Sequence, residues 1–196
     1  RMNKKNVFKV LGLMMIFLLT GMVGFAQSDL PTFDLKGNVR SCEGTSIKGM
    51  EALSFLEFSS TGKLLKMNGA SAADCNNGSF SIKRNVMGQI SQISFVVGDG
   101  TTILALLYDT KGKVREVKTY YENEDTGAKV LDGKMVRTYN EKGLPSKEVF
   151  YTARGKVKAI YKYRYTKVDG NGNWIERYAT APAEGVKNEQ ETREIR

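Results

Sequence analysis

Tyr108-Asp-Thr-Lys-Gly112-Lys-Val114 is the stretch of this 196-residue sequence that predicts its fold. It begins with an aromatic residue suited to a strand, and the aspartate that follows can hydrogen-bond its own backbone to start a turn. The glycine takes a positive φ without steric cost, and the valine begins a return strand. The stretch therefore predicts two antiparallel strands joined by a tight turn.

Four other segments repeat this pattern. The copies are Phe58-Ser-Ser-Thr-Gly62-Lys-Leu64, Arg84-Asn-Val-Met-Gly88-Gln-Ile90, Tyr139-Asn-Glu-Lys-Gly143-Leu-Pro145 and Tyr151-Thr-Ala-Arg-Gly155-Lys-Val157. Arg84 replaces the aromatic residue in one copy, and Pro145 replaces the aliphatic residue in another. The intervals between the glycines hold either one strand or a whole hairpin, which is typical of an antiparallel meander.

The predicted fold is therefore all-β: an antiparallel meander of roughly ten to twelve strands, forming a strongly twisted single sheet or a half-open barrel. Residues 28–36 are expected to be a short leader and residues 38–43 the first strand. Residues 123–133 are expected to be an exposed loop, and residues 189–196 an edge strand.

Three further segments give the chain a resemblance to a known group. They are Leu35-Lys-Gly-Asn-Val-Arg40 near the start, Gly172-Asn-Trp174, and Thr192-Arg-Glu-Ile195 at the end. With the Tyr108 to Val114 motif, which looks like a YD/RHS-type repeat, they make the chain resemble small secreted Bacteroidetes proteins of unknown function. The resemblance covers residues 34–196 and implies no catalytic residues.

The first 26 residues read as a signal peptide, which leaves residues 27–196 as a single β-repeat domain. Lys4, Lys5 and Lys9 form a positive region, and residues 10–23 form an apolar one. That apolar stretch is shorter than the roughly 20 residues of a transmembrane helix. Small residues at Gly24 and Ala26 predict cleavage before residue 27. The mature protein is thus expected to be periplasmic or extracellular, with no stable membrane anchor.

Charge and residue usage narrow the classes of function. Four basic and no acidic residues precede residue 27, so cleavage lowers the net charge from +9 to +5. Nucleic-acid binding therefore loses most of its support. The sequence has no histidine, which excludes histidine-dependent catalysis and histidine metal ligands. Two cysteines cannot form a four-thiolate zinc site, and no cofactor is expected.

The two cysteines, Cys42 and Cys75, have two interpretations. In the bacterial envelope a disulfide between them is chemically stable and would join the first strand to a later loop. It would stabilise the fold by about 3 kcal/mol if unstrained. The alternative is two free thiols held apart by the fold.

Residues 157–165 are predicted to form a strand with two contrasting faces, because alternate side chains point to opposite sides. One face carries Val157, Ala159, Tyr161, Tyr163 and Tyr165, and the other carries Lys158, Ile160, Lys162 and Arg164. With Trp174, the tyrosines suggest an aromatic platform beside a basic stripe, suited to a sugar or an anionic polymer. The alternative is that the tyrosines line the core and the cations cover the solvent face.

Two acidic segments suggest weaker sites. Asp169-Gly-Asn-Gly-Asn173 resembles the start of a calcium loop, but Trp174 and Thr180 stand where an EF-hand needs glycine and glutamate. Glu122, Glu124 and Asp125 are the densest acidic cluster, and a glycosidase needs two carboxylates across a cleft. A turn and a solvated loop are the alternative interpretations.

The sequence therefore favours a non-catalytic binding or scaffold module of the bacterial envelope. Its expected partners are an envelope protein or a glycan, and its oligomeric state is not predicted. The alternative is a histidine-free glycan hydrolase that uses acidic residues. A third hypothesis, a secreted polycation that binds lipid or nucleic acid, predicts binding that falls steeply with salt.

Overall fold

A computed structural model describes residues 28–44, 55–67, 70–71, 80–97, 99–181 and 186–196. A short 3-10 helix, η1 (Leu30–Phe33), precedes the strands. The strands are β1 (Ser41–Glu43), β2 (Phe55–Phe58), β3 (Leu64–Met67), β4 (Ala70–Ser71), β5 (Phe80–Arg84), β6 (Ile90–Val97), β7 (Gly100–Tyr108), β8 (Val114–Asn123), β9 (Lys129–Tyr139), β10 (Pro145–Thr152), β11 (Val157–Val168), β12 (Trp174–Ala181), β13 (Val186–Thr192) and β14 (Glu194–Ile195). The signal peptide predicted over residues 1–26 lies outside the described residues.

Each copy of the repeated motif forms the predicted turn. Gly112 has a φ of 75°, and its amide donates to the carbonyl of Asp109. The Asp109 carboxylate accepts from the amides of Lys111 and Lys113, at 2.8 and 2.9 Å. In each of the remaining four copies, the equivalent Ser, Asn or Thr side chain accepts a hydrogen bond from a backbone amide. A turn followed by a positive-φ glycine matches the twist of the strands that it joins.

The aromatic residue of the motif links neighbouring turns. The hydroxyl of Tyr108 donates to the carbonyl of Ile90, and that of Tyr139 donates to the carbonyl of Val114. In both cases the acceptor is the aliphatic residue that follows the glycine of the previous copy. Tyr165, which lies outside the motif copies, also donates to a residue of this kind, Pro145, which follows Gly143. In these two copies the motif therefore specifies a contact between turns as well as the turn itself.

Replacing Gly88 by alanine isolates the cost of the positive φ. Gly88 has a φ of +79°, and an added Cβ would meet no atom within 4 Å. We expect Gly88→Ala to lower the free energy of unfolding by about 1–2 kcal/mol, the cost of a left-handed backbone for an L-residue. Gly170→Ala is the matched control, because Gly170 has equal space and no positive φ. Equal urea midpoints for the two variants would contradict this explanation.

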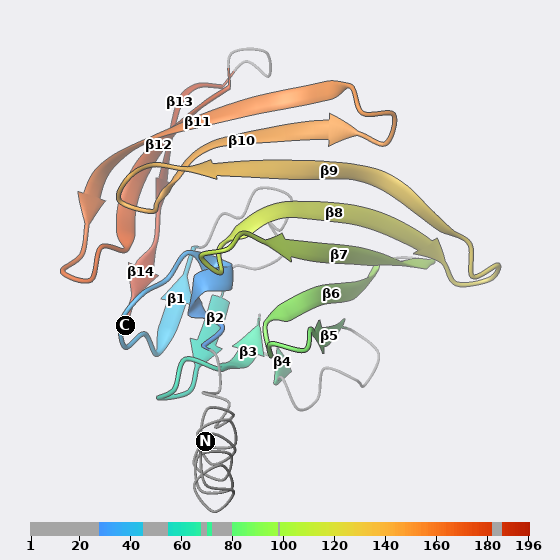
Figure 1. Ribbon diagram of the computed structural model, residues 1–196, viewed down its shortest axis with the longest axis horizontal. Helices are drawn as coiled ribbons and strands as arrows, with labels where there is room; N and C mark the ends of the chain where they lie inside the picture. The colour runs from blue at the N-terminus through green and yellow to red at the C-terminus, as the bar shows by residue number, and fades with distance from the viewer. Residues whose placement is uncertain (1–27, 45–54, 68–69, 72–79, 98, 182–185) are drawn as a thin grey trace, which may run out of the picture.

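The fold is all-β and antiparallel, as predicted, but its strands form two sheets. A nine-stranded sheet has the order β13-β12-β11-β10-β9-β8-β7-β6-β5, and a five-stranded sheet has the order β14-β1-β2-β3-β4. Neither sheet closes into a barrel. In Figure 1 the large sheet arches over the small sheet and η1. The single sheet expected from the sequence would have left its apolar face open, and the N-terminal segment instead covers it.

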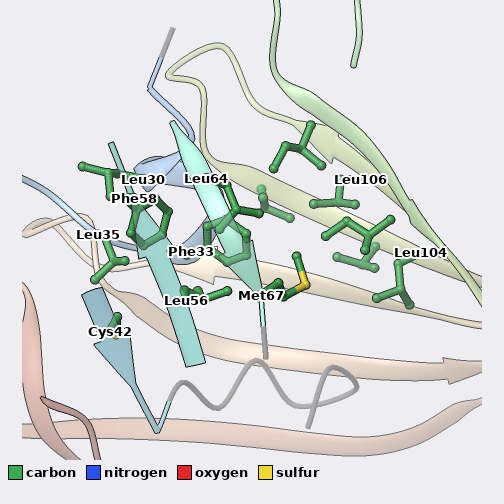
Figure 2. Close-up of a cluster of buried hydrophobic side chains, with 14 of the residues drawn as sticks. Leu30, Phe33, Leu35, Cys42, Leu56, Phe58, Leu64, Met67, Leu104 and Leu106 are labelled. Atoms are coloured by element: carbon green, nitrogen blue, oxygen red, sulfur yellow. The ribbon is translucent and has the colours of Figure 1, made fainter. Parts of the chain in front are cut away.

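The core lies between η1 with the small sheet and the concave face of β6 to β9. Phe33, Leu56 and Phe58 face Leu104 and Leu106 across this interface, and all five are buried (Figure 2). The rings of Phe33 and Phe58 meet edge to face with centroids 5.8 Å apart. The expected leader, residues 28–36, is thus part of the core rather than a simple lead-in.

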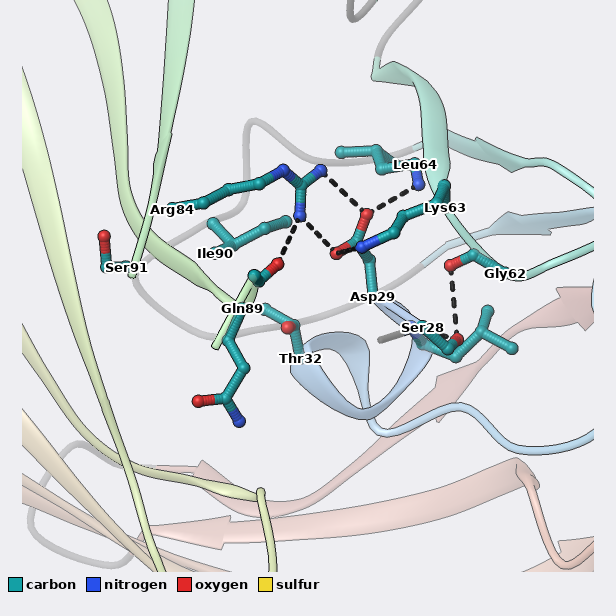
Figure 3. Close-up of polar contacts among 12 residues, drawn as sticks. Ser28, Asp29, Thr32, Gly62, Lys63, Leu64, Arg84, Gln89, Ile90 and Ser91 are labelled. Carbon is teal, nitrogen blue, oxygen red and sulfur yellow. Dashed lines mark hydrogen bonds and ion pairs between the residues drawn. The ribbon is translucent and has the colours of Figure 1, made fainter. Parts of the chain in front are cut away.

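Asp29 fixes the start of this covering segment against both sheets. Its buried carboxylate accepts two hydrogen bonds from Arg84, at 2.6 and 3.0 Å, and one from the amide of Leu64, at 2.9 Å (Figure 3). The Nζ of Lys63 lies 3.8 Å from it. Arg84, the residue that breaks the aromatic rule of the motif, therefore holds the N-terminal segment to the edge of the large sheet.

Three expected boundaries differ from the structure. The first strand is shorter than predicted and covers Ser41–Glu43. The predicted loop at residues 123–133 ends early, because β9 begins at Lys129 and pairs with β8 through Glu122 and Tyr121. The predicted C-terminal strand is divided at Arg193 into β13, which edges the large sheet, and β14, which pairs with β1. Fourteen strands are described, because β4 and β14 are pairs of residues too short to recognise from sequence.

Candidate functional site

β11 carries the residues that the sequence singled out, and from Ala159 to Tyr165 its two faces differ as predicted. At the start of the strand a register shift reverses the prediction, because Val157 is exposed and Lys158 lines the core-facing side. Glu148 and Tyr161 are partners in the register of β10 and β11, and Tyr163 pairs with Ala179 of β12. These side chains belong to the concave, core-facing side of the large sheet. The cationic residues between them are exposed on the opposite side.

The tyrosines of β11 make contacts within the protein. The hydroxyl of Tyr163 donates to Glu148 Oε2 at 2.6 Å, and that of Tyr165 donates to the carbonyl of Pro145. Tyr161 packs edge to face on Phe150, with ring centroids 5.5 Å apart. The structure thus brings the three tyrosines onto one face, where each contacts neighbouring strands.

Trp174 lies in a junction between the two ends of the described chain. Its side chain is 2% exposed, and the guanidinium groups of Arg177 and Arg193 lie 4.3 and 4.2 Å from its ring. Arg193 also donates to the carbonyls of Trp174, Phe33 and Asp34. We call Trp174, Asn173, Arg193 and Lys36 the C-terminal junction.

Asn173 completes the C-terminal junction. Its side-chain oxygen accepts from the amide of Lys36 at 2.6 Å, and its nitrogen donates to the carbonyl of Lys36 at 3.0 Å. Burial lowers the pKa of Arg193 to about 10, so this guanidinium keeps its charge at neutral pH. The three segments that carried the resemblance to secreted proteins therefore meet at one place.

A buried ionic network runs beneath the tyrosines of β11. Arg137 lies between two carboxylates, 2.9 Å from Asp34 and 2.6 Å from Glu148, and all three side chains are buried. Burial alone would lower the pKa of Arg137, but the two carboxylates raise it well above its ordinary value. Arg177 forms a second pair with Glu191 at 2.6 Å and stacks on Tyr163. Each positive charge is thus matched, as an interior requires.

Alkaline pH is expected to destabilise the protein through these internal tyrosines. Burial raises the pKa of Tyr108 and of Tyr165 to about 12, from an ordinary value near 10. Above pH 10 the unfolded chain loses these protons and the folded protein keeps them. Below pH 10 both groups are protonated in the folded and the unfolded chain, so they should not make the free energy of unfolding vary with pH. It should fall by about 1.4 kcal/mol per pH unit for each group up to pH 12.

Urea unfolding at pH 9, 10 and 11 measures this fall, with tyrosinate absorbance near 295 nm as the readout of ionisation. Burial also raises the pKa of Tyr139 and Tyr163, so these groups add to the fall. Tyr108→Phe removes one of the four groups and should give a shallower dependence on pH. A flat stability profile to pH 11, or full tyrosine ionisation in the folded protein, would contradict the assignment.

Two members of the predicted basic stripe, Lys162 and Arg164, are exposed on the convex side of β11. Lys162 lies opposite Lys147 of β10, and Arg164 stacks on Tyr178 at 4.9 Å. Lys158 stands at a register shift between Phe150 and Tyr151, and it lines a pocket on the core-facing side. The stripe therefore divides: Lys162 and Arg164 lie on one side of the sheet, and Lys158 contributes to a concave site on the other.

This pocket has a volume of about 660 Å³ and lies where β8, β9 and β10 meet the turn before β11. Val117 and Met135 of the core line it together with Phe150. Arg154, Lys156 and Lys158 supply its cationic groups, and Asp132 is the one carboxylate among its described lining residues. In Figure 1 the β10–β11 turn lies at the end of the large sheet away from η1 and the small sheet.

No protein-family model matches this sequence, and no curated protein proves similar to it. The functional assignment therefore depends on the geometry of the chain itself. No helix within the described residues has the length and apolar character needed to cross a membrane.

The structure also locates one of the two cysteines and the calcium-like segment. Cys42 is fully buried, and burial raises the pKa of its thiol to about 11. Cys75 lies outside the described residues, so the disulfide stays a prediction. Asp169 accepts from the amides of Asn171 and Asn173, which makes the calcium-like segment an ordinary hydrogen-bonded turn. No group of three or more acidic or cysteine side chains suited to a metal ion occurs in the described part of the chain.

Sequence reasoning missed the buried charges and the pocket. Arg137 shares a strand face with Met135 and Tyr139, so the period-2 alternation of β9 places it on the core side. That signal predicts a buried cation but does not reveal its partner, because Asp34 is 103 residues away in sequence. The pocket depends on a turn that curls beside two strands, which no local pattern indicates.

Proposed function

We propose that this protein is a non-catalytic binding module exported to the bacterial envelope, and that its ligand occupies the pocket beside the β10–β11 turn. One observation carries the proposal: a concave site that combines apolar side chains with cations. Among the described residues, no carboxylate forms an ion pair with Arg154, Lys156 or Lys158. The buried cations of the sheet, Arg137 and Arg177, are each paired with a carboxylate, whereas these three exposed cations have no such partner among the described residues.

Export is supported by the features of residues 1–26, and by the resemblance to secreted proteins. The expected partner is an envelope protein or a glycan. Tyr161 packs edge to face on Phe150, which lines the pocket, and is the member of the predicted aromatic platform nearest to the pocket in the register. Trp174, Tyr163 and Tyr165 support this face from within the protein.

Export and capture test the proposal together. We expect the full sequence, expressed with a C-terminal tag, to yield a protein that is recovered from the periplasm or the medium. Its mass should match a chain whose first residue is Gln27. Incubation of the recovered protein with an envelope fraction should retain a specific protein or glycan. A chain that stays cytoplasmic, or a folded exported chain that retains nothing, would contradict the proposal.

The alternative of glycan hydrolysis by acidic residues gains no support from this pocket. A glycosidase needs two carboxylates about 5 to 9.5 Å apart on either side of the scissile bond. The pocket supplies Asp132 alone among its described lining residues, and Glu124 and Asp125 are exposed in the β8–β9 turn. The binding hypothesis is therefore the one that the geometry favours.

A further inference from the structure

We propose that the pocket beside the β10–β11 turn binds an anionic single-chain amphiphile, such as a fatty acid. This inference rests on the proposed function, and it names the chemical class of the ligand. The site is new with respect to the sequence, which indicated Lys158 but neither the apolar side chains below it nor the cations beside it.

The lower part of the pocket is suited to a hydrocarbon chain. Val117 and Met135 belong to the buried core, each with 4% of its surface exposed, and Phe150 packs against that core. The pocket therefore opens directly onto apolar side chains rather than onto the polar surface. A methionine side chain is unbranched and flexible, so Met135 adapts to irregular apolar shapes. A volume of about 660 Å³ lies within the range of small-molecule sites.

The upper part of the pocket is suited to one negative charge. Arg154 and Lys156 come from the turn, Lys158 comes from the first residues of β11, and all three are exposed. Lys134 also lines the pocket, but its ammonium lies 3.7 Å from Glu116 and over the ring of Tyr151, so its charge is engaged elsewhere. Asp132 offsets one of the three remaining cations. The balance favours an anionic head group over a neutral or cationic one.

The turn holds these cations beside the apolar surface. The amide of Thr152 donates to the carbonyl of Lys156 at 2.8 Å, and the amide of Gly155 donates to the carbonyl of Thr152 at 2.9 Å. The carbonyl of Tyr151 lies 2.5 Å from where a Cβ of Gly133 would be, so the backbones of β9 and β10 approach closely at the pocket. The repeated motif thus positions a binding loop at this end of the sheet.

Binding of dodecanoate, below the concentration at which it aggregates, tests the proposal on the full chain. We expect saturable binding by calorimetry, with at least tenfold weaker binding of dodecanol and no binding of dodecyltrimethylammonium. Dodecanoate should also shift the NMR signal of the Met135 methyl group, assigned with Met135→Leu. Equal binding of all three amphiphiles, or binding that leaves the Met135 signal unchanged, would overturn the proposal.

Charge variants distinguish binding through the cations of the pocket from nonspecific attraction of an anion to a positively charged protein. Arg154→Gln/Lys156→Gln/Lys158→Gln should weaken dodecanoate binding at least tenfold and leave dodecanol binding unchanged. The matched control Lys83→Gln/Lys111→Gln/Arg115→Gln removes three exposed cations elsewhere and should bind dodecanoate like the parent. The apolar N-terminal segment is the same in all these chains, so any dodecanoate that it binds adds equally to each measurement and does not affect the comparison.

The outcome also separates this inference from the proposed function. If the chain retains an envelope component through the same three cations but does not bind dodecanoate, the ligand class is wrong and the binding module stands. If it retains no component and binds no amphiphile, both proposals fail.

Discussion

Arg137→Met is expected to lower the free energy of unfolding by about 3–5 kcal/mol, because it leaves two carboxylates buried without a counter-charge. Arg137 donates to Glu148 Oε1 at 2.7 Å and to Asp34 Oδ2 at 2.9 Å, and its side chain is 2% exposed. Asp34 Oδ1 is already buried without a hydrogen-bond partner among the described residues.

Arg115→Met is the matched control, because Arg115 lies on neighbouring β8 with an exposed side chain. It should change the stability by less than about 0.5 kcal/mol. Urea unfolding followed by far-ultraviolet circular dichroism measures both variants. A loss below 1 kcal/mol for Arg137→Met would show that the two carboxylates find solvent or other partners, against the network described above.

Trp174→Ala should be similarly destabilising, by about 3–5 kcal/mol, because a fully buried aromatic side chain leaves a large cavity. Its ring also lies against the guanidinium groups of Arg177 and Arg193 and contacts Tyr165, with ring centroids 6.5 Å apart. Removing it uncovers both cations and weakens the contact between the C-terminal segment and residues 33–36. We expect the variant to unfold at lower urea and to keep the pocket beside the β10–β11 turn while folded.

Val86→Ala serves as the control for Trp174→Ala, because Val86 is fully exposed in the β5–β6 turn. The comparison also distinguishes the two interpretations of the aromatic platform. Lost stability with unchanged ligand capture would make Trp174 a core residue. Lost capture with stability unchanged within 1 kcal/mol would instead make Trp174 a ligand contact, as the first interpretation from the sequence holds.

Local features were predictable because they depend on adjacent residues. The turn at Gly112 needs a positive φ and a nearby side-chain acceptor, and both are present in the printed sequence. The alternation of Tyr161, Tyr163 and Tyr165 with Lys162 and Arg164 gave the two faces of the middle of β11 directly. It did not give the register shift that places Lys158 on the core-facing side. The all-β meander follows from repeating these local choices along the chain.

The second sheet and the covering helix were not predictable in the same way. Residues 28–36 contain Asp29 and Asp34, which in isolation indicate a polar, exposed segment. Both are buried because arginines reach them from 55 and 103 residues away, and such partners leave no local pattern. The pocket likewise depends on the packing of β8, β9 and β10 against a distant turn.

The measurement that tests the central claim most directly compares what two charge variants retain from the bacterial envelope. The account predicts that the tagged chain retains a specific component, and that Arg154→Gln/Lys156→Gln/Lys158→Gln retains at least tenfold less of it. The control Lys83→Gln/Lys111→Gln/Arg115→Gln should retain as much as the parent. Equal retention by both variants, or no retention by any folded chain, would contradict a binding module that acts through this pocket.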